Sequence, residues 1–390
     1  MLSNFVASLR KANARLIGGM FFHASPGHML SESDYLLRLM RIAPVFKRHR
    51  PVVLLDPTAM ATAVAEVLRF HGVETILHPD AATILREIQL FYPDLVVDVG
   101  QAHWKLVLAD KESHAIGDLY PQSFGWALKA EEFINQHLEL MDTWQKTAGQ
   151  LPFREALSKV PTDPAFLQRL AEKKYVVVQI KAATGNGTAS IIPPANYCTA
   201  LEFLHDNGFA IILGGREPLP EEFKRFEVWD YPRTPFACPA NDFHLLAHAA
   251  CGLFTPSGAN MFCDTLGTPC CQLGLWTMLP QLSPKTVVVP CLLRHRMSGH
   301  LLTFSEQANA FLASYDRVLG PALFDSATYE DLQPSSEDIV NGLREALSPS
   351  PPPPCQAMDT LRSIDPIGMW RAAACRFSPS FLANHPDFVA

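Results

Sequence analysis

The sequence predicts an α/β protein of two Rossmann-like domains that face each other across a cleft. Short apolar segments alternate with segments of helical periodicity, as in a succession of strand–helix units. The apolar segments are hydrophobic throughout, which is typical of parallel strands covered on both faces. The alternation stops at a proline-rich stretch and then restarts. We therefore expect an N-terminal domain over residues 1–160, a C-terminal domain over 161–347 and a further segment over 348–390.

Composition excludes several classes of protein. Apolar residues make up 48% and charged residues 18% of the 390 residues, a globular composition with enough length for two cores. The net charge of −7 argues against a nucleic-acid-binding protein and against a polybasic membrane binder. The nine cysteines are an odd number without a C-x-x-C pair, and we expect reduced thiols in a cytoplasmic protein.

The amino-terminal residues are not typical of a signal peptide, because Arg10, Lys11 and Arg15 interrupt the apolar positions. No uncharged apolar run approaches the roughly 18 residues that cross a bilayer. We expect no transmembrane segment, and peripheral contact with a membrane is compatible with this composition.

In the first half of the chain, strands are expected at residues 16–24, 52–55, 73–77 and 95–99. Helices are expected after a cap at residues 31–34, then over 60–70, 81–91 and much of 117–147. In the second half, strands are expected at 175–180, 209–213, 252–255, 270–273 and 286–293. Helices are expected over 196–204, 241–249, 304–315 and 336–347, and from residue 261. Residues 348–354 are typical of a polyproline linker, after which we expect residues 358–388 not to extend the second core.

The segment from Asn241 to Gly274 carries the clearest functional signal. It contains a strand, a small glycine-containing turn with a hydroxyl group, and a helix. Such a turn presents free backbone N–H groups at the positive end of the helix, where phosphate binds readily. The candidate phosphate-binding residues are Ser257, Gly258, Ala259 and Asn260. The alternative is that Ser257 only caps the helix.

Two other loops of the second half follow strands, the position at which open parallel sheets bind ligands. Lys181 can neutralise a diphosphate, with hydroxyl and backbone donors beside it from Thr184, Gly185 and Asn186. A solvated lysine on a flexible turn is an equal alternative.

Arg216 follows two glycines that allow a ligand to approach closely, and an ion pair with Glu217 or Glu221 is the alternative. Asp242 is most simply interpreted as a helix cap, and a hydrogen bond to a ligand hydroxyl is its second interpretation.

His28 is the candidate catalytic residue of the first half. It lies in the turn after the first strand, where an imidazole can deprotonate an acceptor hydroxyl. A histidine without a chemical role is the alternative. His244 and His248 share a helical face, but the sequence HLLAH lacks the glutamate of a zincin motif, so we expect no metal site.

Several motifs are absent from the sequence. It has no G-x-G-x-x-G after the first strand, no P-loop, no G-x-S-x-G and no D-x-D. Interpretations as a dinucleotide oxidoreductase, a P-loop nucleotidase or an α/β-hydrolase therefore lack a basis.

Residues 175–276 resemble a family of bacterial glycosyltransferases of GT-B architecture found among surface-polysaccharide genes. The matching elements are YVVVQIK, PPANYCTALEFLHDNGFAIILGGRE, the Asp230-Tyr231 pair and NDFHLLAHAACGLFTPSGANMFCDTLGTP. The last element is also similar to heptosyltransferases, in which the S-G turn and its helix meet the donor diphosphate. Where the family usually has an arginine after the first of these strands, this sequence has Lys181, which is not an equivalent phosphate ligand. In the first half, Gly27-His28 followed by Glu32, Asp34 and Arg38 looks like the family's first loop and helix.

The resemblance implies an inverting, metal-independent glycosyltransferase without a bound cofactor. Its donor would be a nucleotide-diphosphate sugar and its acceptor a sugar, a lipid-linked group or a protein, in surface polysaccharide or glycoconjugate synthesis. His28 would be the general base, with Asp34 and Glu32 as substitutes, and the last segment would pack back on the N-terminal domain. A nucleotide-sugar epimerase or hydrolase, and a binding protein without turnover, are the alternatives.

Overall fold

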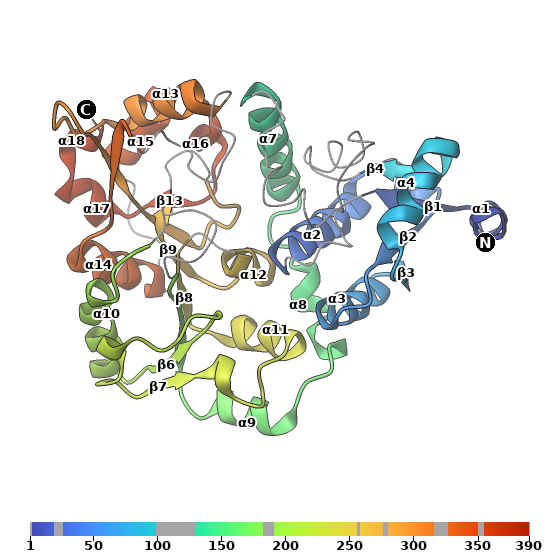
Figure 1. The fold of residues 1–390 in the computed structure, drawn as a ribbon, viewed down its shortest axis with the longest axis horizontal. Coiled ribbons are helices and arrows are strands. Elements are labelled where there is room, and N and C mark those ends of the chain that lie inside the picture. Colours follow the sequence, from blue (N-terminus) through green and yellow to red (C-terminus); the bar gives the residue numbers. More distant parts are fainter. Residues whose placement is uncertain are drawn as a thin grey trace. The chain divides into compact units, whose positions relative to one another are not determined.

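The computed structural model describes residues 2–18, 26–98, 130–181, 191–255, 258–275, 280–315, 327–349 and 355–389 (Figure 1). The chain divides into two compact units. The first comprises Met1–Thr162 and Cys238–Phe243, and the second comprises Asp163–Ala237 and His244–Ala390. Among the helices described, none is both long enough and apolar enough to span a bilayer.

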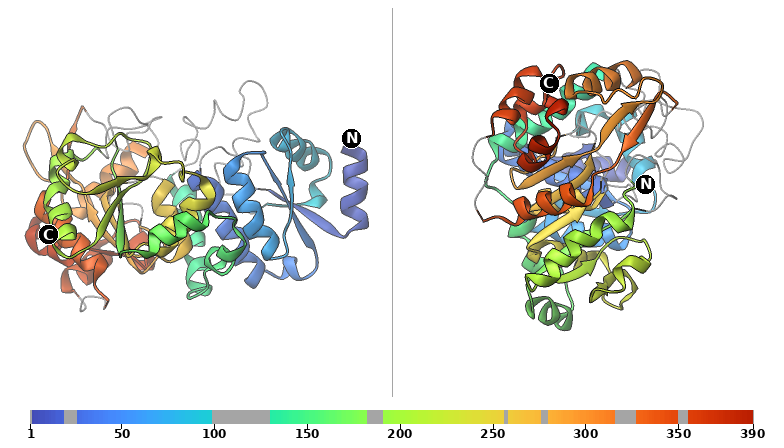
Figure 2. Two further views of the ribbon diagram at one scale, coloured as in Figure 1. Left: turned by 90° about the horizontal axis from the view of Figure 1, so that it is seen from below. Right: turned by 90° about the vertical axis from the view of Figure 1, so that its left-hand side faces the viewer.

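The first unit is built on a four-stranded sheet with the order β3-β2-β1-β4, in which all neighbouring strands are parallel (Figure 2). Its strands are β1 (Ala14–Gly18), β2 (Arg50–Leu55), β3 (Glu74–Leu77) and β4 (Val96–Asp98). Its longer helices are α1 (Leu2–Lys11), α2 (Pro26–Ile42), α3 (Ala59–Phe70), α4 (Ala81–Phe91) and α7 (Ala130–Lys146). Its short helices are η1 (Pro44–Lys47), η2 (Pro93–Leu95), α8 (Pro152–Glu155) and η3 (Leu157–Lys159).

Helices cover both faces of this sheet. On one face, Val6 and Leu9 of α1 and Leu85 and Ile88 of α4 share a buried core with the strand residue Leu16. Helices α2 and α3 contact each other. Because crossovers between parallel strands are right-handed, α2 and α3 lie on the opposite face from α4. Both faces of the strands are therefore covered by helices, which explains why the strand residues are apolar throughout.

Two predicted boundaries in the first unit differ from the structure. Helix α2 begins at Pro26, so residues 31–34 lie inside the helix and do not cap it. The Ser33 hydroxyl donates instead to the Met29 carbonyl oxygen at 2.6 Å. Strand β1 starts two residues before the predicted position, and residues 19–25 of the predicted strand and turn lie outside the described residues, as do residues 117–129 of the predicted helical stretch.

The second unit is built on a seven-stranded sheet with the order β13-β10-β9-β8-β5-β6-β7, again parallel throughout. Its strands are β5 (Tyr175–Gln179), β6 (Ala210–Leu213), β7 (Val228–Asp230), β8 (Cys251–Phe254), β9 (Cys270–Leu275), β10 (Thr286–Pro290) and β13 (Arg376–Phe377). A separate antiparallel pair joins β11 (Leu292–His295) to β12 (Tyr329–Leu332), so the predicted strand over 286–293 is divided at Cys291. The two parallel sheets confirm the predicted α/β class.

The main helices of the second unit connect its parallel strands. They are α9 (Pro164–Ala171), α10 (Pro194–Asp206), α11 (Pro239–His248), α12 (Gly258–Leu266), α13 (Phe304–Tyr315) and α14 (Ser336–Leu347). Two one-turn helices, η4 (Glu221–Phe223) and η5 (Tyr231–Arg233), lie before and after β7. Helices α10 and α14 pack together, and α14 contacts β9 and β10. A capping box at Ser335 and Asp338 fixes the start of α14.

The carboxyl-terminal segment corrects a prediction. It contains α15 (Gln356–Ile364), α16 (Met369–Ala372), β13, α17 (Pro379–Asn384) and α18 (Pro386–Val389). We expected it to leave the second core and pack on the N-terminal domain, but β13 pairs with β10 at the edge of the second sheet. Phe377 of β13 stacks on Trp370 with ring centroids 4.0 Å apart and also meets Phe304 and Phe388. Burial of these aromatic side chains is the physical reason that the segment belongs to the second unit.

Candidate functional site

The strand order of the second sheet locates its ligand-binding edge. From β5 the chain continues to β6 and β7 on one side, and it then returns to β8, β9, β10 and β13 on the other side. Because crossovers between parallel strands are right-handed, the helices that follow β5 and β8, α10 and α12, lie on opposite faces of the sheet. Ligands of open parallel sheets bind at this topological switch point.

Lys181 lies on the β5 side of the switch point, two residues after the end of the strand. It is half-buried, and this burial lowers the pKa of Lys181, while the nearby Glu217 carboxylate opposes the shift. A bound anion would relieve the cost of burying this charge, because an opposite charge favours the protonated amine. The position therefore suits a phosphate.

The loop after β6 is held close to β5 by its glycines. Gly215 has a φ of +84°, and a Cβ added there would lie 3.0 Å from Cγ of Gln179. A Cβ at Gly214 would lie 3.1 Å from Cγ1 of Val177. The two glycines thus allow a close approach to the backbone, as expected from the sequence. The groups that lie close to them in the structure are side chains of β5.

Arg233 stabilises the same loop from the other side. Its guanidinium donates to the carbonyl oxygens of Arg216 at 2.8 Å and Glu217 at 2.6 Å, and it pairs with Asp230 at 3.3 Å. The Arg216 side chain is exposed, and no ion pair of the described residues includes it. Glu221, one of its expected partners, pairs with Lys224.

Helix α12 begins on the β8 side of the switch point, and its first residue is Gly258. The N-terminus of the helix therefore lies at the carboxyl end of β8, as predicted from the turn, and carries the positive end of the helix dipole. Asn260 is buried, and its side-chain amide donates to Gln281 Oε1 at 2.7 Å. One turn further along, the buried Asp264 carboxylate accepts hydrogen bonds from the backbone N–H groups of Leu282 and Ser283 at 3.1 and 3.3 Å. These contacts hold the helix in place.

The same edge carries buried oxygen atoms that sequence reasoning missed. Four of them accept no hydrogen bond within the described ranges: Thr255 Oγ1, Gln272 Oε1, Asp331 Oδ1 and Gln333 Oε1. Thr255 follows β8, and Gln272 lies on β9 opposite Phe254. Gln333 lies against the end of β9, since its Oε1 would be 3.2 Å from a Cβ at Gly274. Buried acceptors without donors are costly, so a ligand or water that supplies hydroxyl groups would stabilise this edge.

Asp331 is the titratable member of this group. Burial raises its pKa to about 6, while hydrogen bonds from Cys291 and Gln333 lower it. Gln333 Nε2 donates to Asp331 Oδ2 at 2.8 Å. Glutamine within an otherwise apolar strand, as in CCQLG, was the sequence signal that could have revealed part of this edge.

In the first unit, the switch point lies between β1 and β4, because β2 and β3 follow β1 on one side and β4 lies on the other. His28 belongs to the first turn of α2, directly after this point. Its side chain lies outside what the structure describes.

The two substitutes for His28 are buried further along α2, in its second and third turns. Asp34 is 3% exposed and accepts from Arg38 Nε at 2.7 Å, and its pKa is raised by burial although Arg38 lowers it. Arg38 is fully buried, stacks 3.5 Å from the ring centroid of Trp144 and donates to Thr147 Oγ1 at 3.0 Å. Asp34 therefore has a structural role that joins α2 to α7. Glu32 is 1% exposed on the same helix.

Asp242 and its neighbours are not caps. Helix α11 begins at Pro239, so Asn241 and Asp242 lie within its first turn, and Asn241 accepts a hydrogen bond from the Thr162 hydroxyl. Residues 238–243 cluster with the first unit. His244 and His248 lie side by side with ring centroids 6.1 Å apart, and no group of described residues could hold a metal ion.

Some predicted residues cannot be placed. Thr184, Gly185, Asn186 and Ser257 lie outside the described residues, as does the side chain of Ala259.

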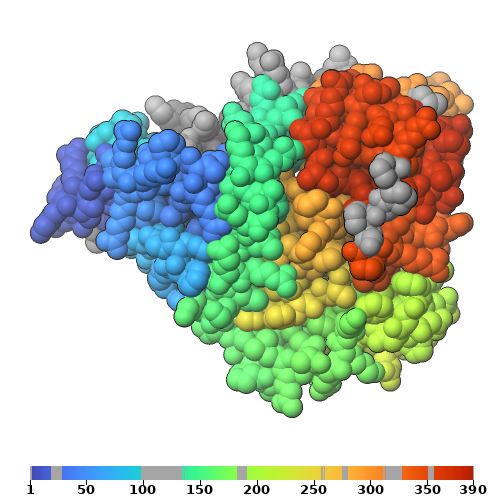
Figure 3. Space-filling view, turned by 180° about the vertical axis from the view of Figure 1, so that it is seen from behind, coloured from blue at the N-terminus to red at the C-terminus, as the bar shows by residue number. Residues whose placement is uncertain are grey.

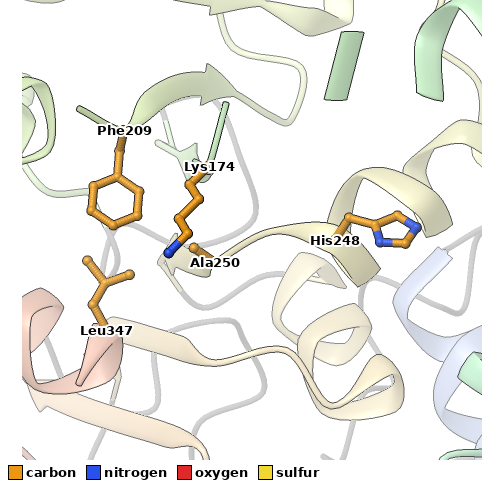
Figure 4. Close-up of a pocket in the computed structure, with 5 residues that line it drawn as sticks. All are labelled: Lys174, Phe209, His248, Ala250 and Leu347. Carbon is orange, nitrogen blue, oxygen red and sulfur yellow. The ribbon is translucent and has the colours of Figure 1, made fainter. Parts of the chain in front are cut away.

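A pocket of about 320 Å³ opens at the opposite, amino-terminal edge of the second sheet. Lys174, Phe209 and Ala250 line it, each directly before a strand, and so do His248 and Leu347, which end α11 and α14 (Figure 4). The carboxyl ends of helices carry negative partial charge, which disfavours phosphate. This pocket is therefore not suited to a phosphate group.

Comparison with known proteins finds similarity only at the level of structure. No protein-family model matches the chain, and no curated protein matches its sequence. A solved glycosyltransferase of family 9 from Veillonella parvula is 12% identical with a TM-score of 0.46, and the match covers 86% of this chain and 97% of that chain. The E. coli ADP-heptose heptosyltransferase II is 15% identical with a TM-score of 0.44, over 86% and 98% of the two chains. A UDP-GlcNAc 2-epimerase from Neisseria meningitidis is 10% identical with a TM-score of 0.36, over 95% and 98%.

Proposed function

We propose that this chain is a glycosyltransferase that moves a sugar from a nucleotide-diphosphate sugar to a hydroxyl acceptor. The observation that carries the proposal is the switch point between β5 and β8, which has Lys181 on one side and the N-terminus of α12 on the other. A cation and a helix N-terminus beside one switch point are suited to a diphosphate.

The remaining polar groups of this edge complement a sugar. A diphosphate offers only acceptors, so it binds to the lysine and to backbone N–H groups. Sugar and ribose hydroxyls offer donors, and these match the buried oxygens of Thr255, Gln272 and Gln333. One ligand that contains both parts satisfies both sets of groups.

Transfer would invert the anomeric carbon in one displacement. The acceptor oxygen forms a bond to this carbon, the bond to the diphosphate breaks, and the nucleotide diphosphate leaves with the electron pair. His28 would take the proton of the acceptor hydroxyl, which typically contributes about 100- to 10,000-fold. Lys181, Arg216 and the α12 N-terminus would stabilise the leaving group in place of a metal ion. Synthesis of surface polysaccharide or another glycoconjugate is the process that such a transfer would serve.

A binding experiment tests the donor site. We would measure the affinities of ADP, UDP, CDP, GDP and dTDP by calorimetry for the wild-type protein and for Gly258→Val. The added side chain crowds the first backbone N–H groups of α12, so nucleotide affinity should fall at least about tenfold, the effect of losing roughly one charge-assisted hydrogen bond. Ala165→Val is a matched control, since Ala165 lies exposed in the first turn of α9. Undiminished binding by a folded Gly258→Val protein would place the diphosphate elsewhere.

A turnover experiment separates the three activities considered. Release of nucleotide diphosphate only with an acceptor indicates transfer, and release without an acceptor indicates hydrolysis. Conversion of the sugar without release indicates epimerisation. Binding without any turnover indicates a non-catalytic protein. Activity should survive EDTA, and its complete loss would contradict the metal-independent mechanism.

A further inference from the structure

The amino-terminal edge of the first sheet gathers basic side chains from separate segments. Helix α1 ends at Lys11 just before β1, η1 ends at Lys47 just before β2, and α4 ends at Phe91 shortly before β4. Because the amino ends of parallel strands meet at one edge, these three segment ends lie along it. We call this surface the basic edge, and it comprises Arg10, Lys11, Lys47, Arg48, Arg50, Leu90 and Phe91.

Hydrogen bonds and a ring contact tie the members of the basic edge together. The Asn13 side chain donates to the Arg48 carbonyl oxygen at 2.9 Å, and Arg50 N donates to the Asn13 carbonyl oxygen at 3.3 Å. The Arg10 guanidinium lies 5.6 Å from the ring centroid of Tyr92, the residue after Phe91. The ends of α1, η1 and α4 therefore form one continuous surface.

The basic edge has an excess of positive charge. Arg10 and Arg50 form long ion pairs with Asp94 at 3.8 Å and with Glu74 at 3.4 Å. Lys11, Lys47 and Arg48 are exposed, and no ion pair among the described residues includes them. In a chain of net charge −7, such a local cationic surface would orient the protein toward an anionic partner.

Two large apolar side chains are exposed beside these charges. Leu90 is 60% exposed and Phe91 is 65% exposed at the end of α4. The other apolar residues of this helix are buried in the core that α4 shares with α1, as Leu85 and Ile88 are, or are partly buried against it. Leu90 and Phe91 therefore do not serve the fold of the first unit.

We propose that the basic edge docks on the surface of an anionic membrane. Its cations would contact the lipid headgroups, and Leu90 and Phe91 would enter the boundary between headgroups and acyl chains. This combination of exposed basic and apolar side chains is that of interfacial membrane binders. A nucleic acid would use the cations but would leave the aliphatic Leu90 exposed. Docking here would bring the protein to lipid-linked molecules whether or not the proposed sugar transfer is correct.

The test is co-sedimentation of the full chain with vesicles of phosphatidylcholine and phosphatidylserine, against vesicles of phosphatidylcholine alone. The wild-type protein should bind only the anionic vesicles, and binding should weaken as salt is added. A variant with Lys11→Ser, Lys47→Ser and Arg48→Ser should lose about 100-fold in partition coefficient, since each cation contributes about fivefold. Phe91→Asp should lose at least about tenfold without a change in the cations.

Matched controls carry the same changes elsewhere. A variant with Lys159→Ser, Lys173→Ser and Lys224→Ser removes three exposed cations outside the basic edge. Met297→Asp alters a side chain that is 94% exposed in the second unit. Both controls should bind like the wild-type protein. Equal losses in the triple variant and its control, no binding to anionic vesicles, or tighter binding of a short RNA duplex would overturn the proposal. All the substituted side chains are exposed, so the variants should fold, and circular dichroism checks this.

Discussion

Replacement of Asp264 tests how the candidate donor helix is held. The Asp264 carboxylate is 1% exposed and accepts hydrogen bonds from Leu282 N at 3.1 Å, Ser283 N at 3.3 Å and the Thr286 hydroxyl at 3.4 Å. These bonds join α12 to the segment that leads into β10. Figure 3 shows the molecule from behind, with this part of the chain coloured yellow to orange. Asp264→Ala would leave two buried backbone N–H groups without an acceptor.

The expected magnitude follows from these groups. Each buried donor without a partner costs about 1–3 kcal/mol, which sums to about 2–6 kcal/mol. Alanine favours a helix over aspartate by about 0.5 kcal/mol, which offsets a small part. We therefore expect the free energy of unfolding to fall by about 3 kcal/mol. Asp264→Asn keeps one acceptor oxygen and should lose about half as much.

Urea unfolding followed by circular dichroism measures this change. The control is Asp359→Ala, which removes an exposed aspartate from the first turn of α15 and should cost under about 0.5 kcal/mol. Nucleotide affinity of Asp264→Asn, measured below its unfolding transition, should also fall, because the N-terminus of α12 is less firmly positioned. A loss under about 0.5 kcal/mol in Asp264→Ala would refute the reasoning that this carboxylate holds the helix.

Three further predictions concern other parts of the chain. Asp331, with its pKa raised to about 6 by burial, contributes stability at low pH that is lost as the pH rises through about 6. Asp331→Asn should therefore be more stable than the wild-type protein by about 1–2 kcal/mol at pH 7.5 but not at pH 4, and parallel stability curves would contradict this. Gly342→Ala should lower the melting temperature, because the new Cβ would clash with Val289 and lie 3.1 Å from Cys271 Sγ. An unchanged or higher melting temperature would show that α14 can shift away from the sheet. His28→Ala should reduce turnover about 100- to 10,000-fold at unchanged nucleotide affinity, and normal turnover would assign the base to another group.

Much of the architecture follows from local sequence. Uniformly apolar segments such as YVVVQI and CGLF identified β5 and β8, because strands buried on both faces need apolar side chains at every position. The start of α12 was predicted at residue 261, three residues after its actual start at Gly258, because capping and turn preferences locate a helix end only to within a few residues. The approximate positions of these elements could therefore be predicted from the residues of each segment alone.

Strand order and long-range packing were decided only by the tertiary structure. The position of the switch point between β5 and β8 depends on which strands pair, and the same local pattern is compatible with other orders. The weakly apolar segment of β13 joined the second sheet because Phe377 could stack on Trp370, a contact that has no local signature. The buried oxygens of Gln272 and Gln333 come from segments about 60 residues apart in the sequence. Only tertiary packing brings them to the same end of the sheet. Sequence by itself determined the elements and their chemistry, and tertiary packing determined which of these groups share a site.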